Sequence, residues 1–142
     1  MSMTQEEKQL LIKDLCARIP YGLFCQTEDG KGKLISVECS TGEDLVYVDF
    51  GYPEAKEYDL NEGDSIKPYL RPMSSMTEEE KIELCTISYA PDEMKTIDEK
   101  LYVIKTNAKY AADFYNEHHF DYRGLIPMGL ALEAKEGMYK TE

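Results

Sequence analysis

Two adjacent histidines and a nearby aspartate, His118, His119 and Asp121, are the residues best suited to chemistry in this chain. The chain contains no other histidine. Imidazole and carboxylate groups bind metal ions and act as general acids or bases. Adjacent residues of a helix point about 100° apart, so neighbouring histidines rarely bind one metal ion together. We therefore predict a structural pair, with a small metal-dependent hydrolase as an alternative.

The same segment continues with Tyr122 and Arg123 and then reaches a glycine. Polar and aromatic side chains beside a turn are common in binding sites, because loops carry function more often than buried elements do. We therefore predict His118, His119, Asp121, Tyr122 and Arg123 as candidate binding residues.

Motifs that would identify an enzyme are missing from the sequence. There is no G-x-S-x-G nucleophile motif, no glycine-rich phosphate-binding loop and no H-E-x-x-H pair. No catalytic residue, metal site or cofactor is therefore predicted. The missing motifs favour a non-enzymatic protein, and an enzyme stays an alternative.

A second candidate binding segment runs over residues 67–77 and is the net-basic stretch of an acidic chain. It contains Lys67, Tyr69 and Arg71 together with two prolines and two methionines. Tyrosine, arginine and methionine are favoured at protein interfaces. We expect a rigid linker braced by prolines, with a binding edge carried by Lys67, Tyr69 and Arg71 as the alternative.

Charge and composition exclude several classes of function. The chain has 142 residues, with 28 acidic and 16 basic side chains and a net charge of −12. It has no apolar run of about 18 residues and no basic, apolar leader, so a cytoplasmic protein without a membrane span is expected. Phosphates repel this much negative charge, which disfavours direct binding of nucleic acid. An acidic inhibitor that imitates nucleic acid would fit the same charge.

The four cysteines are Cys16, Cys25, Cys39 and Cys85. No C-x-x-C spacing supports a zinc or redox motif. In a reducing cytosol such residues mostly behave as small buried hydrophobes. We predict structural thiols, and Cys25 and Cys39 fall in apolar strand-like runs.

Helices must position both candidate segments. A capping box at Thr4 and Glu7 predicts a helix over 5–17, with Leu11 and Leu15 one turn apart and Arg18 on the same line. A second capping box, Thr77 with Glu80, predicts a helix to residue 86 or 87 with Ile82 and Cys85 towards the core. A third helix is predicted from Asn107 to His118, and residues 93–105 are ambiguous between strand and helix.

Between the first two helices the sequence predicts strands. The expected strands are 21–27, 34–39, 44–50, 56–60 and 65–70, with Ile35, Val37 and Cys39 on one apolar face. Short strands separated by glycine-rich turns favour an antiparallel meander, either a small twisted sheet or an SH3-like barrel. The apolar segment 125–132 is predicted to dock on the body, and only residues 136–142 to fray.

These elements predict one α+β domain over residues 1–142. An N-terminal helix occupies about 1–20, a β meander or barrel about 21–72, and a packed helical part about 73–142.

Three blocks of the sequence carry a family resemblance: KDLCARIPYG (13–22), KPYLRPMSSMTEEE (67–80) and HHFDYRGLIPMGLALEA (118–134). They resemble a family of short uncharacterised proteins from gut Bacteroidetes, their phages and mobile elements. The resemblance covers most of the chain in the same order, and Lys135 stands where the family ending has proline. It implies a cytosolic accessory protein of prophage or mobile-element origin, and it implies no catalytic residues.

The leading hypothesis is therefore a non-enzymatic protein-binding or adaptor domain with a protein partner, and a homo-oligomer is left open. The first alternative is an acidic inhibitor or nucleic-acid mimic directed at a host DNA-binding protein. The second is the metal-dependent hydrolase at His118, His119 and Asp121.

Overall fold

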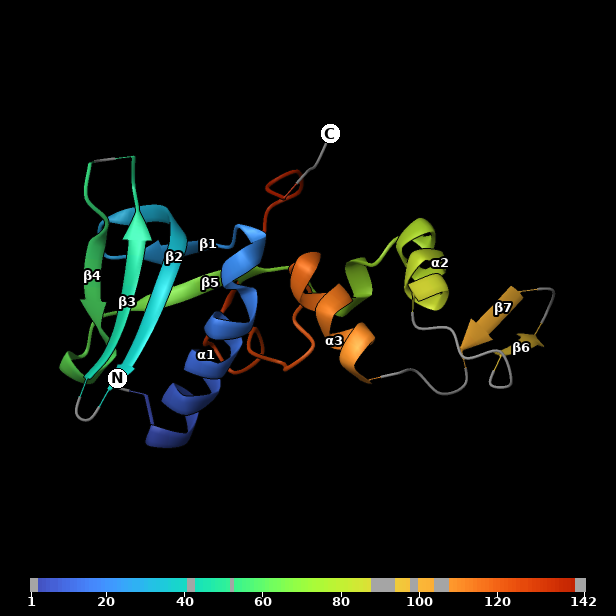
Figure 1. Cartoon of the computed structure of the whole chain (residues 1–142), viewed down its shortest axis with the longest axis horizontal. Coiled ribbons are helices and arrows are strands. Elements are labelled where there is room, and N and C mark those ends of the chain that lie inside the picture. The colour runs from blue at the N-terminus through green and yellow to red at the C-terminus, as the bar shows by residue number, and fades with distance from the viewer. Residues whose placement is uncertain are drawn as a thin grey trace.

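The computed structural model describes residues 3–40, 43–51, 53–87, 94–97, 100–103 and 108–139. The fold is α+β, as predicted: a six-stranded sheet packs with an N-terminal helix, and further helices follow the sheet. Figure 1 shows the sheet and the N-terminal helix at one end of the molecule, and a helix with a two-stranded hairpin at the other. Within the described part of the chain, no helix has both the length and the apolar character needed to traverse a lipid bilayer.

Helix α1 (Gln5–Arg18) begins at the predicted capping box. The Thr4 hydroxyl accepts a hydrogen bond from the Glu7 backbone N–H at 3.1 Å, and the Glu7 carboxylate accepts one from the Thr4 N–H at 2.9 Å. Leu11 and Leu15 are fully buried in the main core, as their spacing predicts. The helix ends one residue later than predicted, where a short 3₁₀ turn begins.

The sheet has the strand order β4-β3-β2-β1-β5-β8. Its strands are β1 (Phe24–Thr27), β2 (Gly30–Ser40), β3 (Glu43–Asp49), β4 (Lys56–Asp59), β5 (Ile66–Leu70) and β8 (Leu132–Glu133). The first five pair antiparallel, as predicted, but β5 returns to pair with β1 instead of lying beside β4. The C-terminal tail adds β8, which runs parallel to β5. In Figure 1, β1 and β5 run across the direction of β2, β3 and β4, so the sheet is strongly twisted.

Strand β2 changes its pairing partner along its length. Its first residues pair with β1, and from Lys33 onward it pairs with β3. A bulge between Leu34 and Ser36 follows this change of partner. A Cβ atom at Gly32 would collide with Val48, so only glycine fits at this close approach of β2 to β3.

The bulge overturns part of the predicted burial pattern in β2. Leu34 is buried, whereas Ile35 is 44% exposed and Cys39 is exposed, contrary to the prediction that both face inward. Val37 alone of the three predicted positions packs against the core. The extra residue in the bulge puts Ile35 out of step with Val37. Cys39 is on the same face of the strand as Val37 but lies near the end of β2, where it is exposed.

The helical half of the chain contains two helices and a hairpin. Its elements are the 3₁₀ turn η3 (Met73–Ser75), α2 (Glu78–Ile87), β6 (Met94–Ile97), β7 (Lys100–Val103) and α3 (Ala108–Glu117). The second capping box is confirmed, since the Thr77 hydroxyl and the Glu80 carboxylate accept each other's backbone N–H at 3.1 and 2.9 Å. The ambiguous segment 93–105 contains the antiparallel β6–β7 hairpin.

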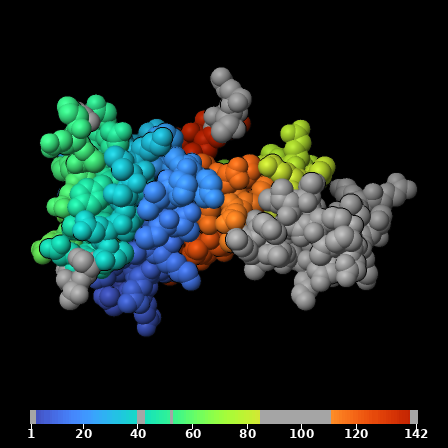
Figure 2. Space-filling model, in the orientation of Figure 1, coloured from blue at the N-terminus to red at the C-terminus, as the bar shows by residue number. Residues whose placement is uncertain are grey.

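The prediction that Ile82 faces the core is wrong, because this side chain is 66% exposed. Helix α2 packs beside α3 and away from the sheet, so its middle does not meet the main core. The side chain of Cys85 lies outside the described residues. Figure 2 shows the segment that follows residue 111 lying between α1 and α2.

The C-terminal segment is docked, as predicted. Leu125, Leu130 and Ala131 are buried in the same core as α1 and the sheet. The expectation that the chain frays from residue 136 is wrong at Tyr139, which packs against this core. Residues 140–142 lie outside the described part.

Candidate functional site

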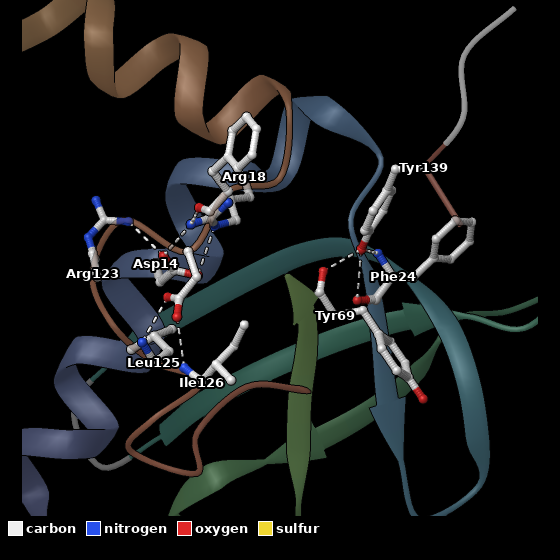
Figure 3. Close-up of polar contacts among 10 residues, drawn as sticks. Asp14, Arg18, Phe24, Tyr69, Arg123, Leu125, Ile126 and Tyr139 are labelled. Atoms are coloured by element: carbon white, nitrogen blue, oxygen red, sulfur yellow. Dashed lines mark hydrogen bonds and ion pairs between the residues drawn. The ribbon is translucent and has the colours of Figure 1, made fainter. Parts of the chain in front are cut away.

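A buried ion pair links the last turn of α1 to the segment after α3. Asp14 and Arg18 are both fully buried. The Arg18 Nε and Nη2 atoms donate to the two Asp14 carboxylate oxygens at 2.9 and 3.0 Å, and Nη2 also donates to the Phe120 carbonyl at 2.6 Å (Figure 3). A charge removed from water this completely is retained only when it is paired, so the two residues depend on each other.

Arg123 completes this ion-pair cluster from the other side of Asp14. Its Nη1 atom donates to the Asp14 carboxylate at 2.7 Å, and its side chain is 16% exposed. Both guanidinium groups also lie over the ring of Tyr122, at 5.5 Å for Arg18 and 4.4 Å for Arg123. Helix α1 and the segment that contains Tyr122 and Arg123 are therefore joined by three charged side chains and one aromatic ring.

Asp121 shapes the turn that follows. Its two carboxylate oxygens accept hydrogen bonds from the backbone N–H groups of Leu125 at 2.7 Å and Ile126 at 2.9 Å. The side chain is 7% exposed. Both carboxylate oxygens are engaged by the fold, which indicates a structural role for Asp121.

Arg71 holds α2 to the same place. Its guanidinium donates two parallel hydrogen bonds to the Glu80 carboxylate, each 2.7 Å long, and lies 4.2 Å from the centre of the Phe120 ring. This arginine lowers the pKa of Glu80 to about 2. The Arg71 backbone also bonds to His119 and Asp121 in a parallel bridge. The contacts of Arg71 thus fix the segment 67–77 to α2 and to residues 119–121, as expected of a rigid linker.

The two histidines face different surroundings. His118 lies on the α2 side, with Nδ1 3.5 Å from Glu80 and Nε2 3.7 Å from Glu83. His119 is 7% exposed and stacks on Tyr139 with ring centres 3.6 Å apart. Within the described residues, no group of three His, Cys, Asp or Glu side chains is arranged to hold a metal ion.

His119 adopts a backbone conformation that is uncommon outside glycine, with φ of 64°. Burial, followed by the nearby charges of Arg18, His118 and Arg71, lowers its pKa to about 4. The imidazole is therefore neutral at pH 7 and is not poised to exchange protons near neutrality.

Tyr139 fastens the C-terminal tail to the sheet. Its hydroxyl donates to the Tyr69 carbonyl at 2.7 Å and accepts from the Phe24 backbone N–H at 2.9 Å (Figure 3). Its ring stacks on Phe24 and His119. The predicted residue Tyr69 takes part through this carbonyl, while its own hydroxyl donates to Gln26 at 2.6 Å.

We call the set Asp14, Arg18, Arg71, Glu80 and residues 118–123 the junction. It contains six of the eight predicted site residues: Arg71, His118, His119, Asp121, Tyr122 and Arg123. Sequence reasoning did not include Asp14 and Arg18 among them, although a charged pair four residues apart beside the leucine stripe was the available signal. Tyr139 had no sequence signal, since it was assigned to the fraying end.

The junction and the neighbouring Asn116 contain buried polar atoms without a hydrogen-bond partner. Among the described residues these atoms are Arg18 Nη1, Asn116 Oδ1, His118 Nε2, His119 Nδ1 and Tyr122 OH. All of them belong to Arg18 or to residues 116–122. Native proteins leave few such atoms unpaired, so this part of the fold is where ordered water is expected.

Lys67 lies elsewhere, in a groove of about 520 Å³ between the start of α1, the β4–β5 turn and the loop near residue 129. The groove has apolar walls, lined by Met3, Leu60, Ile66, Met128 and Leu130. Its charged and polar lining residues are Glu7, Lys8, Asn61, Asp64, Ser65 and Lys67. A volume of this size falls within the range of ligand-binding pockets.

The charged groups of the groove differ in their partners. Glu7 caps α1, Lys8 contacts Asn61 and lies 3.9 Å from Asp44, and Asp64 accepts from the Asp59 N–H. Among the described residues, the Lys67 ammonium has no hydrogen bond or ion pair. Lys67 is only half-buried, so it can meet a ligand that enters the groove.

Comparisons with protein-family models, with curated proteins and with solved structures find no match to this chain. The junction and the groove are therefore the features from which a function can be inferred.

Proposed function

We propose that this protein is a non-enzymatic protein-binding domain that holds a segment of its partner in the groove. The observation that carries the proposal is the groove itself. It brings apolar residues, of which Leu60, Ile66 and Leu130 are buried, together with Lys67, whose ammonium has no hydrogen bond or ion pair within the described part of the chain. Met3 and Met128 line its walls, and flexible methionine side chains suit surfaces that accommodate another protein. The partner segment is expected to insert an apolar side chain and to offer an acceptor to Lys67.

A binding role rather than a catalytic one is supported by the junction. Asp121 engages both of its carboxylate oxygens with backbone groups, and Asp14 binds two arginines. His119, with its lowered pKa, lies under Tyr139. The groups that could act as acids, bases or ligands are thus used to hold α1, α2 and the tail together.

We also propose the cytoplasm as the compartment and a prophage or mobile element as the origin. The family resemblance of the three sequence blocks supports both. Free thiols at Cys16, Cys25 and Cys39 support a reducing compartment.

Site-specific photocrosslinking tests the binding role. A photoreactive phenylalanine analogue is placed at Met128, on the groove, and in a control protein at Ile35, on β2. The two native side chains are exposed to almost the same extent, 45% and 44%. Both proteins are incubated with a Bacteroidetes lysate, and adducts are identified by mass spectrometry.

One defined adduct from position 128 and none from position 35 is the expected result. The purified partner should then bind at least about tenfold more weakly to the Lys67→Glu variant, because reversing the charge places repulsion where an acceptor should bind. Equal adducts from the two positions, or unchanged affinity of Lys67→Glu, would contradict binding in the groove.

A second candidate, an acidic mimic of nucleic acid, is favoured by the outer face of the sheet. Glu38 on β2 and Glu57 on β4 flank Tyr47 on β3, with carboxylate oxygens 3.1 and 3.0 Å from the Tyr47 hydroxyl. These acids raise the pKa of Tyr47 to about 12. A mimic would bind its partner through this face, so Glu38→Gln with Glu57→Gln should abolish capture while Lys67→Glu leaves it intact.

A further inference from the structure

The last strand of the sheet covers only part of its neighbour. Strand β5 has five residues, but β8 pairs only with the last two, Tyr69 and Leu70. Pro68 explains why the pairing stops there, because proline has no N–H to donate to a further residue of the tail. The start of β5, at Ile66 and Lys67, therefore has β1 on one side and no strand on the other side within the described structure.

The tail residues that would continue β8 beside the start of β5 turn away from it. Gly129 bends the chain there with a φ of 78°, a conformation that glycine adopts readily. A longer β8 would direct the Leu130 N–H at the Ile66 carbonyl. This N–H donates instead to the Leu125 carbonyl at 3.0 Å. The groove lies between residues 128–130 and the start of β5, in the space that this turn leaves.

The main-chain groups of Ile66 face the β8 side of β5 and are unpaired. The Leu70 carbonyl accepts from the Ala134 N–H on that side, at 2.8 Å. Main-chain groups alternate between the two edges of a strand, so the N–H and carbonyl of Ile66 point the same way, and its pair with Thr27 on β1 is one without hydrogen bonds. Within the described residues neither group has a hydrogen bond, and Ile66 is only 2% exposed. Buried main-chain groups are seldom left unpaired, which points to a partner that enters from the groove.

Ile66 and Lys67 offer different chemistry on the two faces of the strand. Ile66 packs in the core with Leu60 and Leu130, which also line the groove. Lys67 points to the opposite face, because successive side chains of a strand alternate, and its ammonium has no partner among the described residues. An extended segment beside β5 would therefore place an apolar side chain on the face of Ile66 and the adjacent side chain on the face of Lys67, where an acidic group fits.

We propose that the partner segment binds as an added β-strand, antiparallel to the start of β5, with an acidic residue followed by an apolar one. This inference rests on the proposed binding function and names the conformation and sequence of the bound segment. In the antiparallel arrangement, the apolar residue opposite Ile66 donates its N–H to the Ile66 carbonyl and accepts the Ile66 N–H, so one residue satisfies both groups. The preceding acidic residue then lies opposite Lys67. Strand addition at an open sheet edge is a recurring mode of peptide recognition.

The test titrates the isotope-labelled full chain with the peptide acetyl-Thr-Thr-Glu-Leu-Thr-Thr-amide and follows the backbone amides by NMR. Binding should shift the signals of Ile66, Lys67 and Leu130 and should slow hydrogen exchange at the Ile66 amide. A methyl group on the leucine nitrogen removes the donor aimed at β5 and should weaken binding at least about tenfold. The matched control carries the methyl group on the glutamate nitrogen, which points away from β5, and should bind like the parent peptide.

A charge variant completes the test. Lys67→Gln should weaken binding of the parent peptide but not of a peptide with glutamine in place of glutamate. If both methylated peptides bind like the parent, the groove holds side chains without strand pairing, so strand addition is refuted while the proposed binding role stands. Tighter binding of the peptide with the order Leu-Glu, or unchanged amide signals at millimolar peptide, would also overturn strand addition. Crosslinking from position 128 decides the binding role separately.

Discussion

The junction and the groove both place charged side chains between α1 and the later part of the chain, but under opposite conditions. In the junction Asp14 and Arg18 are withdrawn from water and bound to each other. In the groove Lys67 is half-buried and has no partner within the described structure. The difference indicates that the junction uses charge to hold the fold, whereas no described contact of the fold uses the charge of Lys67, as the proposed binding role requires.

The largest expected loss of stability comes from breaking a buried ion pair rather than an exposed one. Asp14→Ala leaves Arg18 buried without a counter-ion and should lower the free energy of unfolding by about 3–5 kcal/mol, measured by urea denaturation. The control is Lys56→Met, which breaks an exposed pair with Asp29 that is shorter, at 2.6 Å, than the 2.9 Å pair of Asp14 and Arg18. It should cost far less, because water screens an exposed ion pair.

A double variant keeps this prediction testable even if Asp14→Ala does not fold. Asp14→Leu combined with Arg18→Met replaces the pair by apolar side chains and should be more stable than Asp14→Ala. Equal losses from Asp14→Ala and Lys56→Met would show that the junction is not a dry ion-pair site.

The second-largest effect is a dependence of protein stability on pH that is caused by His119. Its pKa is about 4 in the folded protein, against 6.5 for the unperturbed group. Between these values the unfolded chain binds a proton that the folded chain does not, so stability should fall as the pH decreases from 6.5 to 4. The loss should reach up to about 3 kcal/mol and level off below pH 4. Urea denaturation across this range measures it.

Two variants test whether His119 causes this change in the free energy of unfolding with pH, here called the pH slope. His119→Asn tolerates the positive φ and removes the titrating group, so its stability should change less between pH 6.5 and 4. His118→Asn, the neighbouring control, should keep the wild-type slope. Equal slopes in wild type and His119→Asn would refute the assignment.

A smaller effect is expected at the edge of the junction, where α2 begins. Thr77→Ala removes the hydroxyl that accepts the Glu80 N–H and should cost about 1 kcal/mol in urea denaturation. Thr77→Ser retains the hydroxyl and serves as the control. A Thr77→Ala protein as stable as wild type would show that α2 does not depend on its capping box.

The smallest effect on stability is expected in the groove. Lys67→Gln removes a charge that no described side chain uses, so the free energy of unfolding should change by less than about 0.5 kcal/mol. Affinity for the crosslinked partner should nevertheless fall. A large loss of stability would mean that Lys67 supports the fold and that the contrast with the junction is false.

Local chemistry explains which features the sequence could predict. Both capping boxes formed as expected, because each depends on residues only three positions apart. The antiparallel strands followed from alternation and glycine-rich turns. Leu11 and Leu15 were recognised as core for the same reason, since their spacing needs no knowledge of distant residues.

Other features could not be predicted, because they depend on contacts between distant segments. The bulge beside Ile35 put this side chain on the opposite face from Val37, since strand alternation fails wherever a bulge inserts a residue. The buried Arg18 binds not only Asp14 on its own helix but also the Phe120 carbonyl, 102 residues away.

The sequence by itself determined the α+β class, the helix starts and most strands of the sheet, because short-range propensity and hydrophobic period set these features. It also singled out His118, His119, Asp121, Tyr122 and Arg123 as candidate binding residues. Only the tertiary structure decided what those residues do, placing them in a buried junction and leaving Lys67 apart in an open groove. The physical reason is that the role of a charge depends on its distance from water and from a counter-charge, and the folded chain alone fixes both.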